Sequence, residues 1–235
     1  MNGYLKNFKP QLEALNSVYF ELIKNIEDKV SLKKWWAFGG GTALSIFHFQ
    51  HRKSFDIDIF VSEAQLFDFL DPKWYIDDTT VFNTSEYRFD GFTKHLKLKT
   101  KNDIKVDFLL NEALIHKPIK NELIDLEFDL YYESIEDIIA KKIKYRKEDN
   151  LTRDIFDLAV AISKESEILN NLLLARFVTT DDLHKLKSSL HNLNLNEYNL
   201  ELEKIEPQKA YLDISLNANE IILDSIHSTL ESIRR

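Results

Sequence analysis

Residues 39–61, GGGTALSIFHFQHRKSFDIDIFV, decide the fold of the first part of this 235-residue chain. The stretch opens with three consecutive glycines, although the whole chain has only five. Glycines in a row mark a place where the backbone turns sharply or approaches another group closely. The last eight residues, SFDIDIFV, alternate polar and apolar side chains, which predicts a strand with one buried face. Between them, TALSIFHFQ predicts a short helix with Thr42 as its N-cap.

The predicted strand carries two aspartates two residues apart. Because successive side chains of a strand point to opposite faces, Asp56 and Asp58 project from the same face, about 6–7 Å apart. The intervening Ile57, with Ile59 and Val61, then faces the core. Two carboxylates on one side suit Mg²⁺, which binds a few carboxylates together with phosphate oxygens and water.

The glycine turn supplies the second half of such a site. Backbone N–H groups of a turn, and the N-terminus of the helix that follows it, can cradle phosphate oxygens. The turn is not a Walker A loop, because no lysine follows the glycines, and no later glycine completes a G-x-G-x-x-G motif. Turn and acids together predict in-line nucleotidyl transfer from a nucleoside triphosphate, with two metal ions about 3.5–4 Å apart on the attacking and leaving oxygens.

A third acid is expected in such a site, and Asp107 is the candidate. The segments HLKLKT (95–100) and DIKVDFLL (103–110) predict two strands joined by a turn at residues 101–103. A neighbouring strand can bring Asp107 beside the first two acids, whereas Asp103 falls in the predicted turn.

Lysines alternate along the first of these two strands. Lys97, Lys99 and Lys101 would share one face, and Lys94 and Lys105 flank them. Two interpretations stay open at this point: a patch that faces RNA, or the solvent side of an edge strand.

The remaining chain divides into a mixed part and a helical part. Apolar residues at helical spacing predict a helix over residues 8–29, a second short helix is expected at 65–71, and the pattern is helical from about residue 134 onward. We therefore expect an α+β protein with two domains. Residues 1–130 form an α/β domain, a mixed sheet flanked by helices, and residues 131–235 form a C-terminal helical domain.

Composition excludes several classes of protein. Hydrophobic residues make up 44% and charged residues 30%, which is typical of a globular chain rather than a disordered one. The absence of cysteine excludes disulfides and thiolate metal sites. No apolar run is long enough to cross a bilayer and the N-terminus does not look like a signal peptide, so we expect a cytoplasmic protein without membrane contact. The net charge of −8 argues against nucleic acid, but residues 154–235 hold 8 Lys/Arg against 14 Asp/Glu, so most of the excess is C-terminal.

Four motifs in this order resemble the AbiEii/AbiGii-type nucleotidyltransferase toxins, also called the DUF1814 group. The first two are GGTAL (40–44) and HRKSFDIDIF (51–60). Downstream, EDIIAKK (136–142) resembles the third motif of that family and RDIFDL (153–158) the fourth. Together they span residues 38–160, about half of the chain.

The resemblance implies a DNA-polymerase-β-like nucleotidyltransferase fold and a role for each matched residue. Gly40, Gly41 and Thr42 would hold the triphosphate, and Arg52 and Ser54 would orient the loop or contact phosphate. Lys142 matches the family lysine that meets nucleotide phosphate. Asp154 matches the acidic position of the fourth motif, and Asp157 shares its helix face. The metal ligands would be Asp56, Asp58 and Asp107, the last as third acid or base.

The resulting hypothesis is a nucleotidyltransferase that uses Mg²⁺ or Mn²⁺ and an NTP, acting as the toxin of a toxin–antitoxin or phage-abortive-infection system. Its acceptor would be RNA, such as the 3′ end of tRNA, and an antitoxin protein would be its partner. Two alternatives stay open: a protein-modifying, AMPylase-like transferase, or a catalytically silent module of the same fold that binds nucleotide, RNA or protein.

Overall fold

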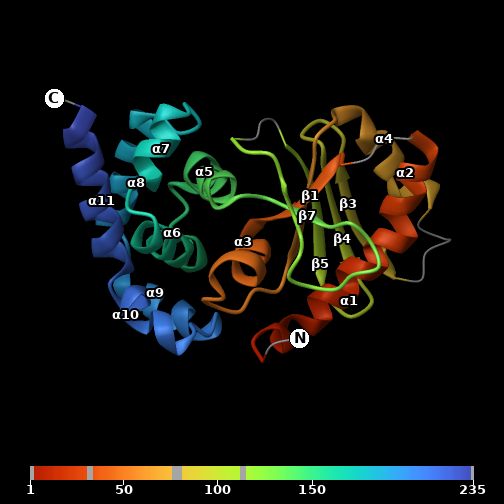
Figure 1. Cartoon of the computed structure of the whole chain (residues 1–235), viewed down its shortest axis with the longest axis horizontal. Helices are drawn as coiled ribbons and strands as arrows, with labels where there is room; N and C mark the ends of the chain where they lie inside the picture. Colours follow the sequence, from red (N-terminus) through yellow and green to blue (C-terminus); the bar gives the residue numbers. More distant parts are fainter. Residues whose placement is uncertain (1–2, 31–33, 76–80, 112–114, 234–235) are drawn as a thin grey trace. The chain divides into compact units, whose positions relative to one another are not determined.

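The computed structural model describes residues 3–30, 34–75, 81–111 and 115–233, which group into two compact units (Figure 1). The first unit consists of residues 1–47 and 54–133, and the second of residues 48–53 and 134–235. The chain thus enters the second unit briefly at residues 48–53, between the two halves of the stretch quoted above.

A mixed sheet forms in the first unit. In the described residues it has seven strands in the order β3-β4-β5-β2-β1-β7-β6. β2 is parallel to β5 and β1 is parallel to β7, whereas the other neighbours are antiparallel. This confirms the α+β class. The strands are β1 (Trp36–Gly39), β2 (Ile57–Val61), β3 (Phe82–Asp90), β4 (His95–Thr100), β5 (Lys105–Leu110), β6 (Ile119–Lys120) and β7 (Tyr131–Tyr132).

The alternation of β2 determines which face of the sheet is buried. Ile57, Ile59 and Val61 are completely buried, while Asp58 and Phe60 on the other face are partly exposed. The same parity holds for Val106 and Phe108 of β5 and for Leu96 and Leu98 of β4, all of which are buried. The predicted strand and its apolar face are therefore confirmed.

Helices lie on both sides of this sheet (Figure 1). Before β1, a 3₁₀ turn (Leu5–Phe8), α1 (Lys9–Val18), a π-helical turn (Tyr19–Ile23) and α2 (Lys24–Val30) follow one another, which confirms the predicted helix. α1 and α2 lie on one side of the sheet, and α3 (Gly40–Ala43), continued by a π-helical turn (Leu44–Phe49), lies on the other. After β2 come short helical segments: Ala64–Leu66, α4 (Phe67–Leu70) and Pro72–Trp74.

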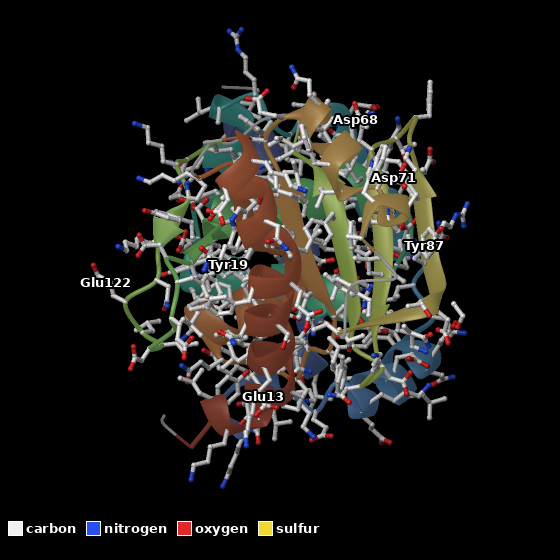
Figure 2. The ribbon with its side chains drawn as sticks, turned by 90° about the vertical axis from the view of Figure 1, so that its right-hand side faces the viewer. Glu13, Tyr19, Asp68, Asp71, Tyr87 and Glu122 are labelled. Atoms are coloured by element: carbon white, nitrogen blue, oxygen red, sulfur yellow. The ribbon has the colours of Figure 1, made fainter. Side chains whose placement is uncertain are left out.

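Tyr19 and Glu27 attach this N-terminal helical segment to the sheet, and Figure 2 labels Tyr19 where the helix passes in front of the strands. The Tyr19 hydroxyl and the Trp36 indole N–H each donate to the Glu27 carboxylate at 3.2 Å. The ring of Tyr19 stacks on Phe128 with a centroid distance of 4.0 Å. Burial, followed by the Glu27 charge, raises the pKa of Tyr19 to about 12, so its hydroxyl remains a donor at neutral pH.

The sequence did not reveal four of the strands, β1, β3, β6 and β7. β1 is buried along its whole length, so it has no alternation between buried and exposed positions. In β3, residues 84–88 are all exposed, so this edge strand has no alternation between buried and exposed positions that a pattern could detect. β6 and β7 are only two residues long. These strands depend on pairing with neighbours rather than on local sequence.

The second unit is helical, as predicted from residue 134 onward. Its helix α6 packs against α5, α7, α9, α10 and α11, and residues 154–162 of α6 are buried. N-terminal caps fix several starts: the Ser134 hydroxyl accepts the N–H of Asp137, and Thr179 with Asp182 forms a capping box. The helices are α5 (Ile135–Arg146), α6 (Thr152–Lys164), α7 (Ile168–Leu174), α8 (Thr180–His191), α9 (Leu195–Lys204), a 3₁₀ turn (Lys209–Tyr211), α10 (Leu212–Leu216) and α11 (Ala218–Ile233).

Among the described helices of both units, none combines the length and the apolar composition that a bilayer crossing needs.

Candidate active site

The glycine turn joins β1 to α3 and lies against one of the predicted acids. Gly40 has φ of +65°, a left-handed conformation that residues with a side chain rarely adopt. A methyl group on Gly40 would lie 1.9 Å from Oδ2 of Asp58. The Asp58 carboxylate therefore packs directly against the backbone of the turn, and only glycine fits there. Gly41 follows within the helix.

Thr42 is not the N-cap that the sequence predicted. The N-cap is Gly39, three residues before Thr42, so the helix already begins at Gly40, and Gly39 has no side chain that could accept a hydrogen bond. Thr42 is buried, and its hydroxyl donates to the backbone carbonyl of Asp56 and is hydrogen-bonded to the Ser54 hydroxyl at 2.8 Å. Thr42 and Ser54 thus connect α3 to the segment that leads into β2.

Asp58 and Asp107 are direct neighbours across the parallel pair of β2 and β5. On its other side Asp58 is opposite Gly39 of β1, and Asp107 is opposite Lys97 of β4. Residues opposite each other in a ladder share a face of the sheet, so the two carboxylates lie side by side. The predicted proximity of Asp107 to Asp58 is confirmed. Asp56 lies just before β2, two residues from Asp58, and is partly exposed.

His95 is a site residue that sequence reasoning missed. Its Nε2 lies 2.6 Å from Oδ1 of Asp107, and both side chains are partly exposed. Only the register of β4 against β5 brings them together, so no local pattern marks His95. A hydrogen bond between a ring nitrogen and a carboxylate helps to fix the orientation of both groups.

Glu133 is the second missed residue. It is completely buried, and one of its carboxylate oxygens would lie 2.3 Å from a methyl group on Gly39. Its backbone N–H donates to the carbonyl of Phe38, and its Oε1 accepts from Asn111 at 3.4 Å. It precedes the N-cap of α5 by one residue and belongs to none of the four motifs.

The acids fit Mg²⁺ or Mn²⁺ in donor chemistry, because adjacent carboxylates are hard oxygen ligands. Within the part of the chain that the structure describes, however, no three or more His, Cys, Asp or Glu side chains form a group that could hold a metal ion. The pair of Asp58 and Asp107 therefore offers at most part of a coordination shell. Mg²⁺ commonly takes one or two protein carboxylates and completes its shell with substrate phosphates and water.

The second unit holds a separate buried cluster centred on Asp157 of α6. Arg52 binds this carboxylate through two nitrogens, Nε to Oδ1 at 2.6 Å and Nη2 to Oδ2 at 2.8 Å. His51 Nε2 lies 2.7 Å from the same Oδ1, and Lys142 Nζ lies 2.9 Å from Oδ2. Asp157 therefore holds residues 51–52 against the helices of the second unit.

Asp154 extends the cluster by one helical turn. It pairs with the Lys142 ammonium and, through its other oxygen, with Arg146 at 3.1 Å. Asp154 and Asp157 share the helix face that faces Lys142, as their spacing predicted. Lys142 is only 8% exposed and is engaged by both carboxylates. The structure thus shows ion pairing for Arg52, Lys142 and Asp154, while their contact with a nucleotide stays a prediction.

Burial and charge act in opposite directions in this cluster. Burial disfavours the charged form of Asp157, but Arg52 and Lys142 outweigh it and hold its pKa well below the ordinary value. Burial also opposes ionisation of Asp154, and Lys142 with Arg146 lowers its pKa. For His51, burial dominates over the attraction of Asp157 and lowers its pKa, so the ring is neutral. The cluster thus holds two negatively charged carboxylates, Asp154 and Asp157, and three positively charged side chains, Arg52, Lys142 and Arg146.

Comparison with known proteins identifies the family. The sequence model of the family described as "Nucleotidyl transferase AbiEii toxin, Type IV TA system" matches residues 25–217. A protein of Borrelia hermsii described as cytidylate kinase is 29% identical over 163 residues, which cover 65% of this chain and 74% of that protein.

Two solved structures are similar at low identity. JHP933 of Helicobacter pylori is 17% identical, with 94% of each chain covered and a TM-score of 0.47. MenT4, a nucleotidyltransferase toxin of Mycobacterium tuberculosis, is 12% identical, with 97% of this chain and 88% of that chain covered and a TM-score of 0.45.

The family match covers most of the chain, including the glycine turn, the acid pair and the Asp157 cluster, and it identifies the protein as a nucleotidyltransferase. The chain belongs to the AbiEii nucleotidyl transferase toxin family, which is the family that its four motifs resemble.

Gly40→Ala tests the close approach of the turn to Asp58. The added methyl group would displace the Asp58 carboxylate and would also be strained at positive φ, so we expect nucleotidyl transfer to be lost while the protein remains folded. Gly91→Ala is the matched control, since its methyl group would meet nothing closer than 3.9 Å. Transfer activity and thermal unfolding of both variants check this, and full activity of Gly40→Ala would contradict the described geometry.

Asp157→Asn tests the buried cluster. Removing one charge leaves Arg52 and Lys142 buried without their shared partner, which costs about 3–5 kcal/mol of unfolding free energy. Asp181→Asn, which affects an exposed i,i+4 pair with Lys185, should be nearly neutral. All three tryptophans lie in the first unit, so urea unfolding is followed by tryptophan fluorescence for that unit and by helical circular dichroism for the helices of both units. Equal stability of Asp157→Asn and wild type would refute the cluster's structural role.

His51→Gln tests the neutral imidazole. Because the folded-state pKa lies below the unfolded value of 6.5, the unfolded state binds a proton first as the pH falls. The contribution of His51 to stability is therefore complete above pH 6.5 and decreases below it, by up to about 1.4 kcal/mol per pH unit. Urea unfolding between pH 7 and 5 should show a flatter dependence for His51→Gln than for wild type or for the exposed His191→Gln. Identical slopes would show that His51 does not titrate in this way.

Proposed function

We propose that this protein transfers a nucleoside monophosphate from an NTP to a hydroxyl group of an RNA acceptor such as the 3′ end of tRNA, with Mg²⁺ or Mn²⁺. The observation that carries the proposal is the ladder pair of Asp58 and Asp107 beside the Gly40 turn. This arrangement combines two adjacent carboxylates with a backbone turn that opens a helix, which are the groups that a metal-bound triphosphate requires.

In the proposed reaction, the acceptor hydroxyl oxygen forms a bond to the α-phosphorus. The bond from the α-phosphorus to the oxygen bridging to the β-phosphate breaks, and pyrophosphate leaves. Divalent cations, when bound, would supply charge neutralisation at the attacking and leaving oxygens. Asp56, Asp58 and Asp107 would be their ligands.

The protein's own groups have separate tasks in this proposal. The turn at Gly40 and Gly41 presents backbone to the triphosphate, and Thr42 with Ser54 holds that turn beside the strand that bears the acids. Asp107 is also the acid placed to accept the hydroxyl proton, and His95 orients its carboxylate. The family resemblance also assigns a role at the nucleotide phosphates to Arg52, Lys142 and Asp154. For these residues to contact a nucleotide, the ion pairs around Asp157 would have to rearrange.

The biological role proposed is that of a toxin. The family description names a type IV toxin–antitoxin system, which implies an antitoxin as partner. Transfer of a nucleotide to the 3′ end of tRNA would block aminoacylation there and arrest growth.

The name of the B. hermsii relative raises phosphoryl transfer to a cytidine nucleotide as another activity. The Walker A motif of P-loop kinases is missing here, since Thr42 rather than the P-loop lysine follows the glycines. The relative nevertheless makes CTP a useful member of the nucleotide series to be tested.

Asp58→Asn tests the proposal. Purified protein is incubated with each labelled NTP, Mg²⁺ and total tRNA, and label on tRNA is expected for wild type. Loss of one carboxylate should lower the rate by about 10²-fold or more, because metal ions contribute several kcal/mol to such transition states. Stability should be unchanged or slightly higher, since like charges opposite each other in a ladder are unfavourable.

Asp103→Asn is the matched control, because Asp103 is an exposed turn residue with φ of +63°, which asparagine tolerates. Undiminished transfer by Asp58→Asn would refute the assignment of the acid pair. Label on protein instead of tRNA would replace the RNA acceptor by a protein acceptor.

A further inference from the structure

The acid pair continues into a row of basic residues across the sheet. Asp107 of β5 is opposite Lys97 of β4, and Lys97 is opposite Arg88 of β3. Side chains opposite each other share a face, so Asp58, Asp107, Lys97 and Arg88 form one row on the face that does not carry the apolar core. Strands lie about 4.8 Å apart, which places Lys97 about 5 Å and Arg88 about 10 Å from Asp107 along the row. Lys105 precedes Asp107 by two residues and lies on the same face.

These three cations are exposed, and in the part of the chain that the structure describes no carboxylate lies within ion-pair distance of them. Arg88, Lys97 and Lys105 are all exposed, and within the described residues none of them forms an ion pair. Lys99, which faces the same way, differs because Glu86 and Asp103 bind it at 3.1 and 2.8 Å. Lys97 is opposite Asp107 in the ladder and Arg88 interacts with the charge of Asp90, but no carboxylate binds any of the three cations directly in the described residues.

Their position costs stability. Like charges directly opposite in an antiparallel pair are destabilising, and Arg88 faces Lys97 in this way. Basic residues on an edge strand can be explained as protection against aggregation. That explanation covers only Arg88, because β3 is the edge, whereas Lys97 and Lys105 lie on the interior strands β4 and β5. Lys97 also faces Asp107, which accounts for that one residue, whereas an anionic ligand accounts for all three together.

We propose that Arg88, Lys97 and Lys105 bind the sugar–phosphate backbone of the RNA acceptor. This inference rests on the proposed function and adds the surface on which the acceptor lies. The row that crosses the sheet has the glycine turn for the NTP at one end and the basic residues at the other. Its members, in order, are Gly39, Asp58, Asp107, Lys97 and Arg88. The acceptor hydroxyl would be at Asp107, and the phosphates preceding it would cross β4 and β3, with Arg88 able to bind a phosphate through two nitrogens.

The test removes two of these charges in the full-length protein. The double variant Arg88→Gln/Lys97→Gln is compared with Lys24→Gln/Lys29→Gln, which removes the same charge from exposed positions of α2 on the opposite side of the sheet. Binding of a labelled 12-nucleotide single-stranded RNA and of tRNA is measured by fluorescence anisotropy between 50 and 300 mM salt. NTP affinity and thermal unfolding are measured for the same proteins.

We expect the double variant Arg88→Gln/Lys97→Gln, called the row variant below, to bind RNA roughly 10–30-fold more weakly at 0.1 M salt. The slope of log affinity against log salt concentration should become shallower by about 1.4, or about 0.7 for each lost phosphate contact. Its NTP affinity should be unchanged, and its melting temperature should be close to that of wild type, because the variant relieves the like-charged pair of Arg88 and Lys97 and also loses the opposite-charged pair of Lys97 and Asp107. The control should match wild type in all of these measurements.

Equal RNA affinity and salt slope in the row variant and wild type would overturn the inference. A parallel loss of NTP affinity would also overturn it, because the cations would then belong to the triphosphate site. The proposed function is judged separately by transfer to tRNA in Asp58→Asn. RNA transfer that depends on Asp58 but has an unchanged KM for RNA in the row variant would leave the function standing and refute this surface.

Discussion

Two carboxylates of like charge, Asp58 and Asp107, lie opposite each other where β2 runs parallel to β5, and the rest of the first unit follows from keeping them there. The pair is unfavourable by itself, so the sheet must impose it. It does so with apolar residues on the reverse face of β2 and β5, which are completely buried and leave no freedom of register. On the acidic face, Gly40 removes the side chain that would collide with Asp58, and His95 fixes Asp107. The same row continues into Lys97 and Arg88, so one strand register arranges acids, glycine turn and cations together.

In the second unit, the main electrostatic feature is a buried carboxylate, Asp157, that is surrounded by basic partners. Asp157 is completely buried and would be costly if it were alone, but Arg52, His51 and Lys142 surround it. Two of these partners come from residues 48–53, the segment that joins α3 to the strand bearing the acids. The family residues Arg52, Lys142 and Asp154 therefore have a structural role that is visible without a nucleotide. A role for them in nucleotide binding would have to compete with these ion pairs.

Much of this arrangement could be predicted from the sequence, because the relevant signals are local. The alternation of SFDIDIFV predicted the buried face of β2, and HLKLKT with DIKVDFLL predicted the hairpin that carries Asp107. The strand begins at Ile57, so the shared strand face predicted for Asp56 and Asp58 stays a prediction. The remainder depended on contacts between distant residues. His95 and Glu133 enter the site only through strand pairing, and β3 has no buried alternation to reveal it. Thr42 was assigned to a cap because its residue type suits one, but the glycines begin the helix before it.

The central claim is that Asp58 and Asp107 jointly bind a divalent cation with the nucleotide. Titration calorimetry of Mn²⁺ into the protein, with a non-hydrolysable NTP analogue present, tests this most directly. The account predicts that wild type binds Mn²⁺ in the presence of the analogue, and that Asp58→Asn and Asp107→Asn each lose most of this binding while remaining folded. Mn²⁺ binding that is unchanged in both variants would show that the ladder pair is not the metal site and would contradict the account.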